Sequence, residues 1–242
     1  MLTWQQTGWM LFTLTIVFSV VFLWFPEIDI HVSAWFFDKA SGFSHRSNAI
    51  FDHIRFFFID GLTFLALLSG VMLIRSALIG ARRAVHINVW GFTVATFLVG
   101  PIILANGILK TFWGRARPSD IEYFGGTAIF SPPLVITDQC ASNCSFVSGE
   151  GSAISAGLIV LAIILWPNLK GIWRGFALFG VLPLSIFGIG LRIITGRHFL
   201  SDTIFAILFC ALVAWVFYRI FDMHKHRHAL RWRDLRKDLL KA

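Results

Sequence analysis

The amino-acid sequence predicts an all-α protein, a polytopic membrane bundle of about six transmembrane helices. Its composition is that of a membrane protein, because 57% of the 242 residues are hydrophobic, only 14% are charged, and there are 26 Phe and 10 Trp. Six stretches are apolar over about 20 residues, the length that a bilayer-spanning helix needs. They lie roughly at 8–25, 56–76, 87–109, 151–167, 175–191 and 199–221.

The first stretch is predicted to be a retained span and not a cleaved signal. It has no basic residue ahead of it and no small-residue cleavage site before Pro26. The segment from Glu27 to Arg55 mixes aromatic residues such as Trp35 with charged residues such as Asp38. Because aromatic rings prefer the membrane interface, we expect a short structure that lies along the outer interface.

Basic residues between the stretches predict the orientation of the chain. Lys and Arg are enriched in cytoplasmic loops. They follow the second, fourth and sixth stretches at Arg75, Arg82, Arg83, Lys170, Arg174 and from Arg219 to Lys241. This pattern places both termini in the cytoplasm and the loops 26–55, 110–150 and 192–198 outside. It also explains the net charge of +8 by contact with anionic membrane lipids, so no nucleic-acid partner is expected.

The chain is expected to form one transmembrane domain over residues 1–222, followed by a basic cytoplasmic tail over 223–242. His224, His226 and His228 alternate in this tail. Alternating histidines can bind metal, but a basic stretch against anionic headgroups is the simpler interpretation. The sequence indicates no obligatory protein partner.

Two of the three cysteines share the long outer loop. Cys140 and Cys144 can form a disulfide closing a very short ring if the loop faces an oxidising compartment, and two free thiols are the open alternative. A metal site is not favoured, since Asp138 is the one further ligand nearby. Cys210 falls in the last apolar stretch and is expected to fill space there.

Three charged blocks occupy the outer ends of the predicted spans. They run from Lys110 to Pro118, from Ser145 to Glu150 and from Arg192 to Asp202. The predicted topology brings all three to one side of the bilayer. Lys and Arg are disfavoured in short external loops, so their presence in the first and third blocks indicates an anionic ligand.

The chemistry of these blocks suits a phosphate group. Lys110 and Arg117 are seven residues apart, so a persisting helix would project both from one face. Ser148 and Gly149 precede a span, where backbone N–H groups at a helix N-terminus attract anions. An Arg-rich loop is more often a solvated or headgroup-facing loop when it occurs alone. The conjunction of three blocks on one face favours a functional site.

His198 and Asp202 are spaced i, i+4 at the start of the last stretch. A carboxylate in that position can accept a hydrogen bond from one imidazole nitrogen, which leaves the other nitrogen free to attack. Such a pair is ordinarily a helix cap or a surface pair, which is the alternative interpretation.

The three blocks resemble the signature of the PAP2 superfamily, K-x6-R-P, P-S-G-H and S-R-x5-H-x3-D. The matching residues are Lys110, Arg117 and Pro118 in the first part and Arg192, His198 and Asp202 in the third. The resemblance covers the chain from Lys110 to Asp202. It implies an integral-membrane lipid phosphatase of the bacterial inner membrane, acting at the periplasmic face on a phosphate monoester, with no metal or other cofactor.

The resemblance also implies residue roles. His198 would attack phosphorus to form a phosphohistidine, and Asp202 would orient it. The phosphate ligands would be Lys110, Arg117, Ser148, Gly149 and Arg192. Arg115 and Arg197, which stand beside these residues, are expected to make secondary headgroup contacts.

The sequence departs from the signature at three positions. Leu191 replaces the usual Ser, Val147 replaces Pro, and Glu150 stands where the superfamily has the histidine that protonates the leaving oxygen. Glu150 is expected to act as the general acid in its place. An inactive site is the alternative.

Two observations point to a substrate. The Ser-Phe-Val-Ser-Gly-Glu block and the segment from Pro26 to Phe43 resemble lipid A phosphatases, of the 4′ type in particular. Undecaprenyl diphosphate, phosphatidylglycerophosphate and phosphatidate remain open as substrates. The rival of another class is a phospholipid-binding or transport protein that lost catalysis.

Overall fold

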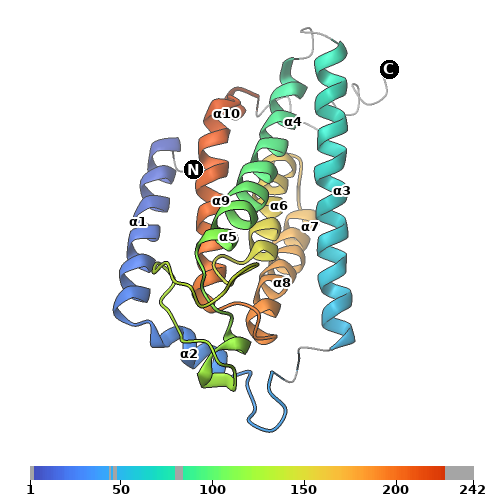
Figure 1. Cartoon of the computed structure of the whole chain (residues 1–242). Helices are drawn as coiled ribbons and strands as arrows, with labels where there is room; N and C mark the ends of the chain where they lie inside the picture. The colour runs from blue at the N-terminus through green and yellow to red at the C-terminus, as the bar shows by residue number, and fades with distance from the viewer. Residues whose placement is uncertain (1–2, 44, 46–47, 80–83, 227–242) are drawn as a thin grey trace.

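The computed structural model describes residues 3–43, 45, 48–79 and 84–226 as a bundle of long helices (Figure 1). Every element in these ranges is helical, which confirms the all-α prediction. The first half contains α1 (Trp4–Trp24), α2 (Glu27–Ala34), α3 (Ala49–Ile79), α4 (Ala84–Phe97), η2 (Leu98–Leu109), α5 (Lys110–Phe112), η3 (Pro118–Asp120) and η4 (Glu122–Phe124). The second half contains α6 (Gly149–Leu165), α7 (Ile172–Phe176), η5 (Ala177–Val181), α8 (Leu182–Ile194), α9 (Leu200–Ile220) and α10 (Met223–His226).

Five helical stretches of the described chain are long and apolar enough to cross a membrane. They are Trp4–Trp24, Ala49–Leu78, Ile87–Phe112, Ile172–Ile194 and Leu200–Ile220. The fourth predicted stretch, 151–167, corresponds to α6, which has 17 residues. At 1.5 Å per residue α6 is about 25 Å long, less than the ~30 Å of a bilayer core. The six predicted stretches therefore correspond to five helices of spanning length and one shorter apolar helix.

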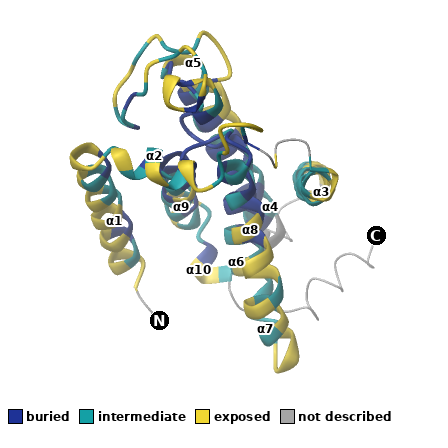
Figure 2. Ribbon diagram, turned by 90° about the horizontal axis from the view of Figure 1, so that it is seen from below, coloured by how far each residue is buried: buried dark blue, intermediate teal, exposed yellow. Residues whose placement is uncertain are grey.

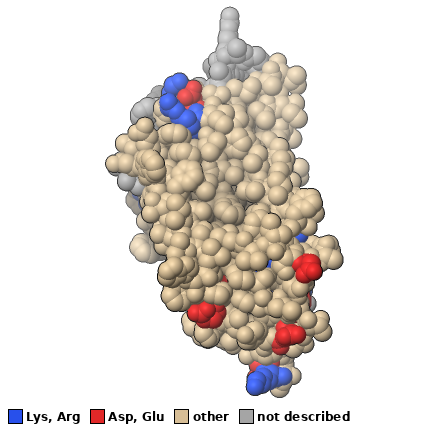
Figure 3. Space-filling model, turned by 60° about the vertical axis from the view of Figure 1, so that its left-hand side comes forward, with Lys and Arg blue, Asp and Glu red and all other residues tan. Residues whose placement is uncertain are grey.

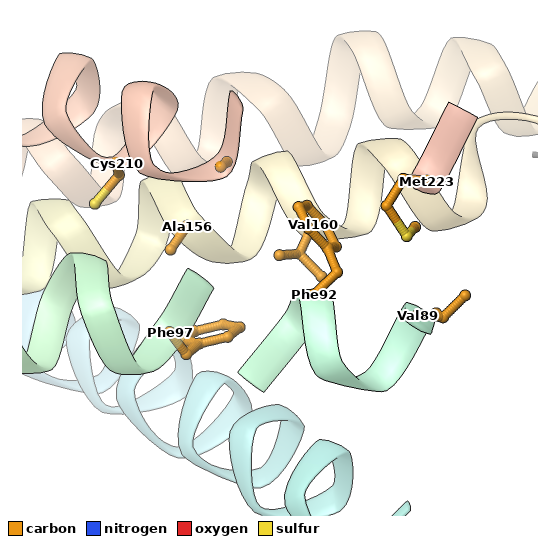
Figure 4. Close-up of a cluster of buried hydrophobic side chains, with 8 residues drawn as sticks. Val89, Phe92, Phe97, Ala156, Val160, Cys210 and Met223 are labelled. Atoms are coloured by element: carbon orange, nitrogen blue, oxygen red, sulfur yellow. The ribbon is translucent and has the colours of Figure 1, made fainter. Parts of the chain in front are cut away.

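The shorter helix α6 lies at the centre of the bundle. It packs against α3, α4, η2, α8 and α9. Small residues on α6, among them Gly151, Ser155 and Gly157, allow the neighbouring helices to approach closely. Ala156 and Val160 of α6 meet side chains of α4, α9 and α10 in a buried cluster (Figure 4). Because α6 is covered by other helices, it does not need the length of a lipid-exposed span.

The third span is one continuous helix with an irregular middle. Pro101 lies inside it, and proline removes a backbone donor and forces the preceding turn apart. The residues around Pro101 form the wider turns of a π-helix, and Asn106 donates its side-chain N–H to the Pro101 carbonyl at 2.6 Å. This turn delivers Lys110 to the end of the bundle.

The outer surface is that of a membrane protein. Figure 3 shows one face on which acidic and basic residues gather near the two ends, with a broad uncharged zone between them. Helices α1 and α3 stand at the edge of the bundle (Figure 2). Only 6% of the apolar window of α3 is buried, so this helix presents its side chains mainly to lipid.

The two described ends of the chain lie at one end of the bundle, opposite α2 (Figure 1). This arrangement fits a prediction that both termini share one side, and their cytoplasmic orientation stays a prediction. Met223 is buried and α10 packs against α4 and α9, so the first residues of the predicted tail contact the bundle. The rest of the predicted tail, 227–242 with His228, lies outside the described residues.

The interfacial segment is shorter than predicted. Only α2 lies across the end of the bundle, whereas Arg55 belongs to the long helix α3 (Figure 1). Asp29 of α2 is fully buried and bonds to the start of α9 through the Ser201 backbone N–H at 2.8 Å. The helix is therefore fixed to the bundle by a buried polar contact.

Candidate active site

The three charged blocks meet at the end of the bundle that carries α2. A cavity of about 500 Å³ opens there between α3, α6 and the end of α8. Six of the predicted site residues line it: Lys110, Arg117, Gly149, Glu150, Arg192 and Arg197. The predicted phosphate ligands are thus brought to one cavity, apart from Ser148.

A turn, and not a helix, brings Lys110 and Arg117 together. The helix ends at Phe112, and Gly114 has a φ of +67°, a left-handed conformation that a side chain disfavours. A Cβ at Gly114 would also collide with the Thr137 carbonyl. The prediction of two helical turns between Lys110 and Arg117 is therefore wrong, although both residues line the same cavity.

Asn143 holds both of these cations. Its side-chain oxygen accepts from Lys110 Nζ at 3.2 Å, and its backbone carbonyl accepts from Arg117 Nη2 at 2.6 Å. Cys140 and Cys144 are joined by a disulfide that closes the short loop around Asn143. The disulfide thus closes the loop that carries Asn143, and Asn143 is a cavity residue that the sequence did not reveal.

His198 is buried behind this cavity. Its backbone N–H donates to the carbonyl of Arg192 at 3.0 Å, so it sits directly behind the wall that Arg192 lines. Its Nδ1 atom lies 2.7 Å from the Ser145 carbonyl oxygen and 3.7 Å from Asp202 Oδ2. A carbonyl only accepts, so Nδ1 carries the hydrogen and Nε2 keeps its lone pair. The expected direct bond to Asp202 is corrected, because 3.7 Å exceeds hydrogen-bond length.

Asp202 acts on His198 through Ser145. The Asp202 carboxylate accepts from Ser145 Oγ at 2.5 Å, from Arg115 Nη1 at 2.6 Å and from the Phe199 backbone N–H at 2.8 Å. The last of these contacts caps the start of α9. Asp202 therefore fixes the residue whose carbonyl orients the imidazole.

Arg115 is buried inside this network and does not line the cavity. Its guanidinium donates to Asp29 Oδ2 at 2.8 Å, to Asp202 and to the Ser131 carbonyl, and it lies 4.3 Å from the centre of the Phe199 ring. Burial by itself lowers the pKa of Arg115, but the carboxylates of Asp202 and Asp29 outweigh this effect and raise the pKa. Burial raises the pKa of Asp29. The predicted headgroup contact of Arg115 is thus replaced by a structural one.

Ser148 and Gly149 form the N-terminus of α6. Ser148 is fully buried, and its Oγ accepts from the Gly151 backbone N–H at 3.1 Å, so the side chain caps the helix. Gly149 lines the cavity, and a Cβ there would collide with the side chain of Asn106. The backbone of Gly149 is therefore accessible where a side chain is not. The backbone N–H of Ser148 donates to the Asp202 carbonyl at 3.1 Å, so the expected phosphate contact of Ser148 is replaced by a structural one.

Glu150 forms an ion pair with Arg55 of α3, which the sequence did not predict. Arg55 Nε lies 2.9 and 3.0 Å from the two Glu150 oxygens, and Arg55 Nη2 lies 2.9 Å from Oε1. Arg192 Nε is 3.6 Å from Glu150 Oε2. Arg55 was not among the predicted site residues, although it is a basic residue at the outer end of a predicted span.

Burial sets the protonation of His198. Burial lowers the pKa of this imidazole from 6.5 to about 4, against the opposing effect of Asp202. Imidazole is neutral above its pKa, so Nε2 keeps the lone pair that a nucleophile needs from about pH 5 upward. We expect the His198 NMR signals in micelles to titrate near pH 4, identified by their loss in a His198→Gln variant. A midpoint near 6.5 would contradict the burial argument.

A membrane bundle whose cavity collects cations beside a neutral, oriented histidine defines a phosphate-ester hydrolase of the membrane. The chain belongs to the PAP2 superfamily, whose model matches residues 88–226. It is a phosphoric monoester hydrolase, as its relatives are.

Three curated relatives match most of the chain. A lipid A 4′-phosphatase of Rhizobium leguminosarum is 33% identical over 85% of this chain and 93% of its own length. A lipid A 4′-phosphatase of Francisella tularensis subsp. novicida (strain U112) is 32% identical over 83% of this chain and 89% of its own length. One of Rhizobium etli is 33% identical over 80% of this chain and 81% of its own. No solved structure gives a significant match.

Proposed function

We propose that the protein removes a phosphate monoester from lipid A at the periplasmic face of a bacterial inner membrane through a phosphohistidine on His198. The observation that carries this proposal is the His198 imidazole held by the Ser145 carbonyl behind a cavity lined by Lys110, Arg117 and Arg192. The 4′-phosphate is the favoured position, because the matching relatives are lipid A 4′-phosphatases.

The reaction begins with in-line attack by His198 Nε2 on phosphorus. Charge then gathers on the equatorial oxygens, where Lys110, Arg117 and Arg192 stabilise it, and the backbone at Gly149 supplies helix N-terminal N–H groups. Glu150 protonates the leaving oxygen. Water hydrolyses the phosphohistidine, with Glu150 as the base. Arg197, at the rim of the same cavity, makes secondary headgroup contacts.

The disulfide supports a periplasmic site. Disulfides persist in oxidising compartments such as the periplasm, and Cys140–Cys144 closes the loop that bonds to Lys110 and Arg117. Five full spans and α6, with the described ends opposite the site, give a topology in which cytoplasmic termini place the cavity outside.

Product analysis by mass spectrometry tests the substrate. Purified protein is incubated in EDTA with lipid A, phosphatidylglycerophosphate, phosphatidate and undecaprenyl diphosphate. We expect phosphate release from lipid A, with fragment masses that show loss of the 4′-phosphate. Release from another lipid alone would move the proposal to that substrate, and release from none would favour the binding-protein alternative.

A further inference from the structure

We propose that Arg55 changes partners during the reaction. Arg55 holds the Glu150 carboxylate before substrate binds, and it passes to the phosphate when that group enters the cavity. This exchange rests on the proposed phosphatase function. It adds a catalytic cation from α3, outside the three signature blocks.

Glu150 is held as a phosphate would be held. The fork of the Arg55 guanidinium donates to both carboxylate oxygens at 2.9–3.0 Å. Arg binds carboxylate and phosphate through the same pair of parallel N–H groups. A phosphate in the cavity that Arg55, Glu150 and Arg192 line together therefore competes with Glu150 for Arg55.

Arg192 supports this interpretation from the other side of the carboxylate. Its Nε is buried and, among the residues that the structure describes, has no hydrogen-bond partner. The nearest acidic oxygen, Glu150 Oε2, is 3.6 Å away, beyond hydrogen-bond length. A buried donor without an acceptor is unfavourable, so a phosphate oxygen that displaces Glu150 satisfies both guanidinium groups.

The position of Arg55 permits the movement. Its side chain is 34% exposed, and α3 stands at the edge of the bundle (Figure 2). Arg55 and Glu150 also line a second, apolar cavity of about 340 Å³ between α3 and α6, next to the first. Arg55 and Glu150 therefore lie where the polar cavity meets the apolar one. The ester oxygen of a lipid phosphate joins its polar phosphate to its apolar part, so it would lie at this boundary.

The exchange supplies the proton that Glu150 needs. A phosphate monoester has a second pKa near 6, so part of the substrate arrives as the monoanion. When Arg55 moves to the phosphate, the monoanion's proton passes to the released Glu150. His198 Nε2 then forms the N–P bond while the P–O ester bond breaks, and the leaving oxygen takes that proton from Glu150.

The second half returns the groups to their starting state. Water attacks phosphorus and gives a proton to Glu150, and the electron pair of the N–P bond returns to Nε2. Glu150 passes its proton to the product phosphate. Arg55 then returns to the carboxylate, so the cycle consumes one ester and one water.

Binding of inorganic phosphate tests the exchange without turnover. Phosphate is titrated at pH 7.5 against wild type, Glu150→Gln, Arg55→Ala and Arg55→Lys, and the rise in thermal midpoint is followed. Loss of the competing carboxylate should tighten binding about tenfold in Glu150→Gln, whereas loss of the cation should weaken it about tenfold in Arg55→Ala. Asp52→Asn is the matched control, because Asp52 carries the same charge on α3 in the same cavity.

A second readout separates the acid role from binding. Glu150→Gln should slow hydrolysis of an alkyl phosphate far more than that of an aryl phosphate, because a phenolate leaves without protonation. If Glu150→Gln binds phosphate no more tightly than wild type or Asp52→Asn does, the exchange is overturned. Arg55→Lys keeps the positive charge and controls for a folding defect in Arg55→Ala. Its affinity for phosphate should lie between those of wild type and Arg55→Ala. Opposite binding shifts without lipid hydrolysis would overturn the proposed function and keep the exchange.

Discussion

A His198→Gln variant is expected to lose phosphatase activity by at least about 10⁴-fold, because it lacks the proposed nucleophile, the imidazole Nε2. Glutamine matches the size of the imidazole and can still donate to the Ser145 carbonyl, so the surrounding network should survive. Phosphate release from the lipid is measured in parallel with capture of the phosphoenzyme after a quench in alkaline detergent, which preserves an N–P bond. Wild type should yield an acid-labile, base-stable phosphate adduct that the variant lacks.

His53→Gln serves as the control for the first prediction. His53 is an exposed residue of α3, two residues before Arg55. Its replacement should leave activity within about twofold of wild type, as for surface substitutions in general. Activity of His198→Gln within tenfold of wild type, in protein that elutes and melts normally, would rule out the phosphohistidine mechanism.

An Arg115→Met variant is expected to be the most destabilised single substitution in the active-site network. Methionine fills the space but leaves the carboxylates of Asp29 and Asp202 buried near each other without their shared cation. Removing one partner of a buried ion network typically costs about 3–5 kcal/mol. The loss should appear as a lowered thermal midpoint and as a fall in kcat, because Asp202 and Ser145 lose their fixed geometry.

Two comparisons decide whether the ion network is the cause. Arg174→Met removes an exposed arginine at another position and should change stability by no more than about 0.5 kcal/mol. Adding Asp29→Asn to Arg115→Met removes one stranded carboxylate and should recover part of the lost midpoint. A double variant less stable than Arg115→Met alone would show that the loss has another origin.

The sequence located most of the cavity because the signature is local. Lys110, Arg117, Arg192 and Glu150 stand in short blocks that resemble the superfamily signature, and all four line one cavity. The blocks did not indicate the backbone conformation that brings these residues to the cavity. Gly114 ends a helix that the seven-residue spacing suggested would continue, since spacing does not reveal a left-handed turn.

Contacts between residues that are far apart in the sequence could not be predicted from the sequence. Arg55 reaches Glu150 across 95 residues, and Asp29 reaches Ser201 across 172. Arg115 illustrates the same limit, because it belongs to the block of phosphate ligands and yet points into the protein. Whether a basic side chain meets a ligand or a buried carboxylate depends on which helices pack behind it.

By itself, the sequence determined the membrane class, the helical fold and the superfamily, and it singled out His198 as the candidate nucleophile. Hydropathy over about 20 residues and charges at fixed spacing carry that information along the chain. Only the tertiary structure decided that α6 is a short central helix, that Ser145 fixes the tautomer of His198, and that Arg55 opposes Glu150. These features arise where helices far apart in sequence meet, and their geometry is set by packing.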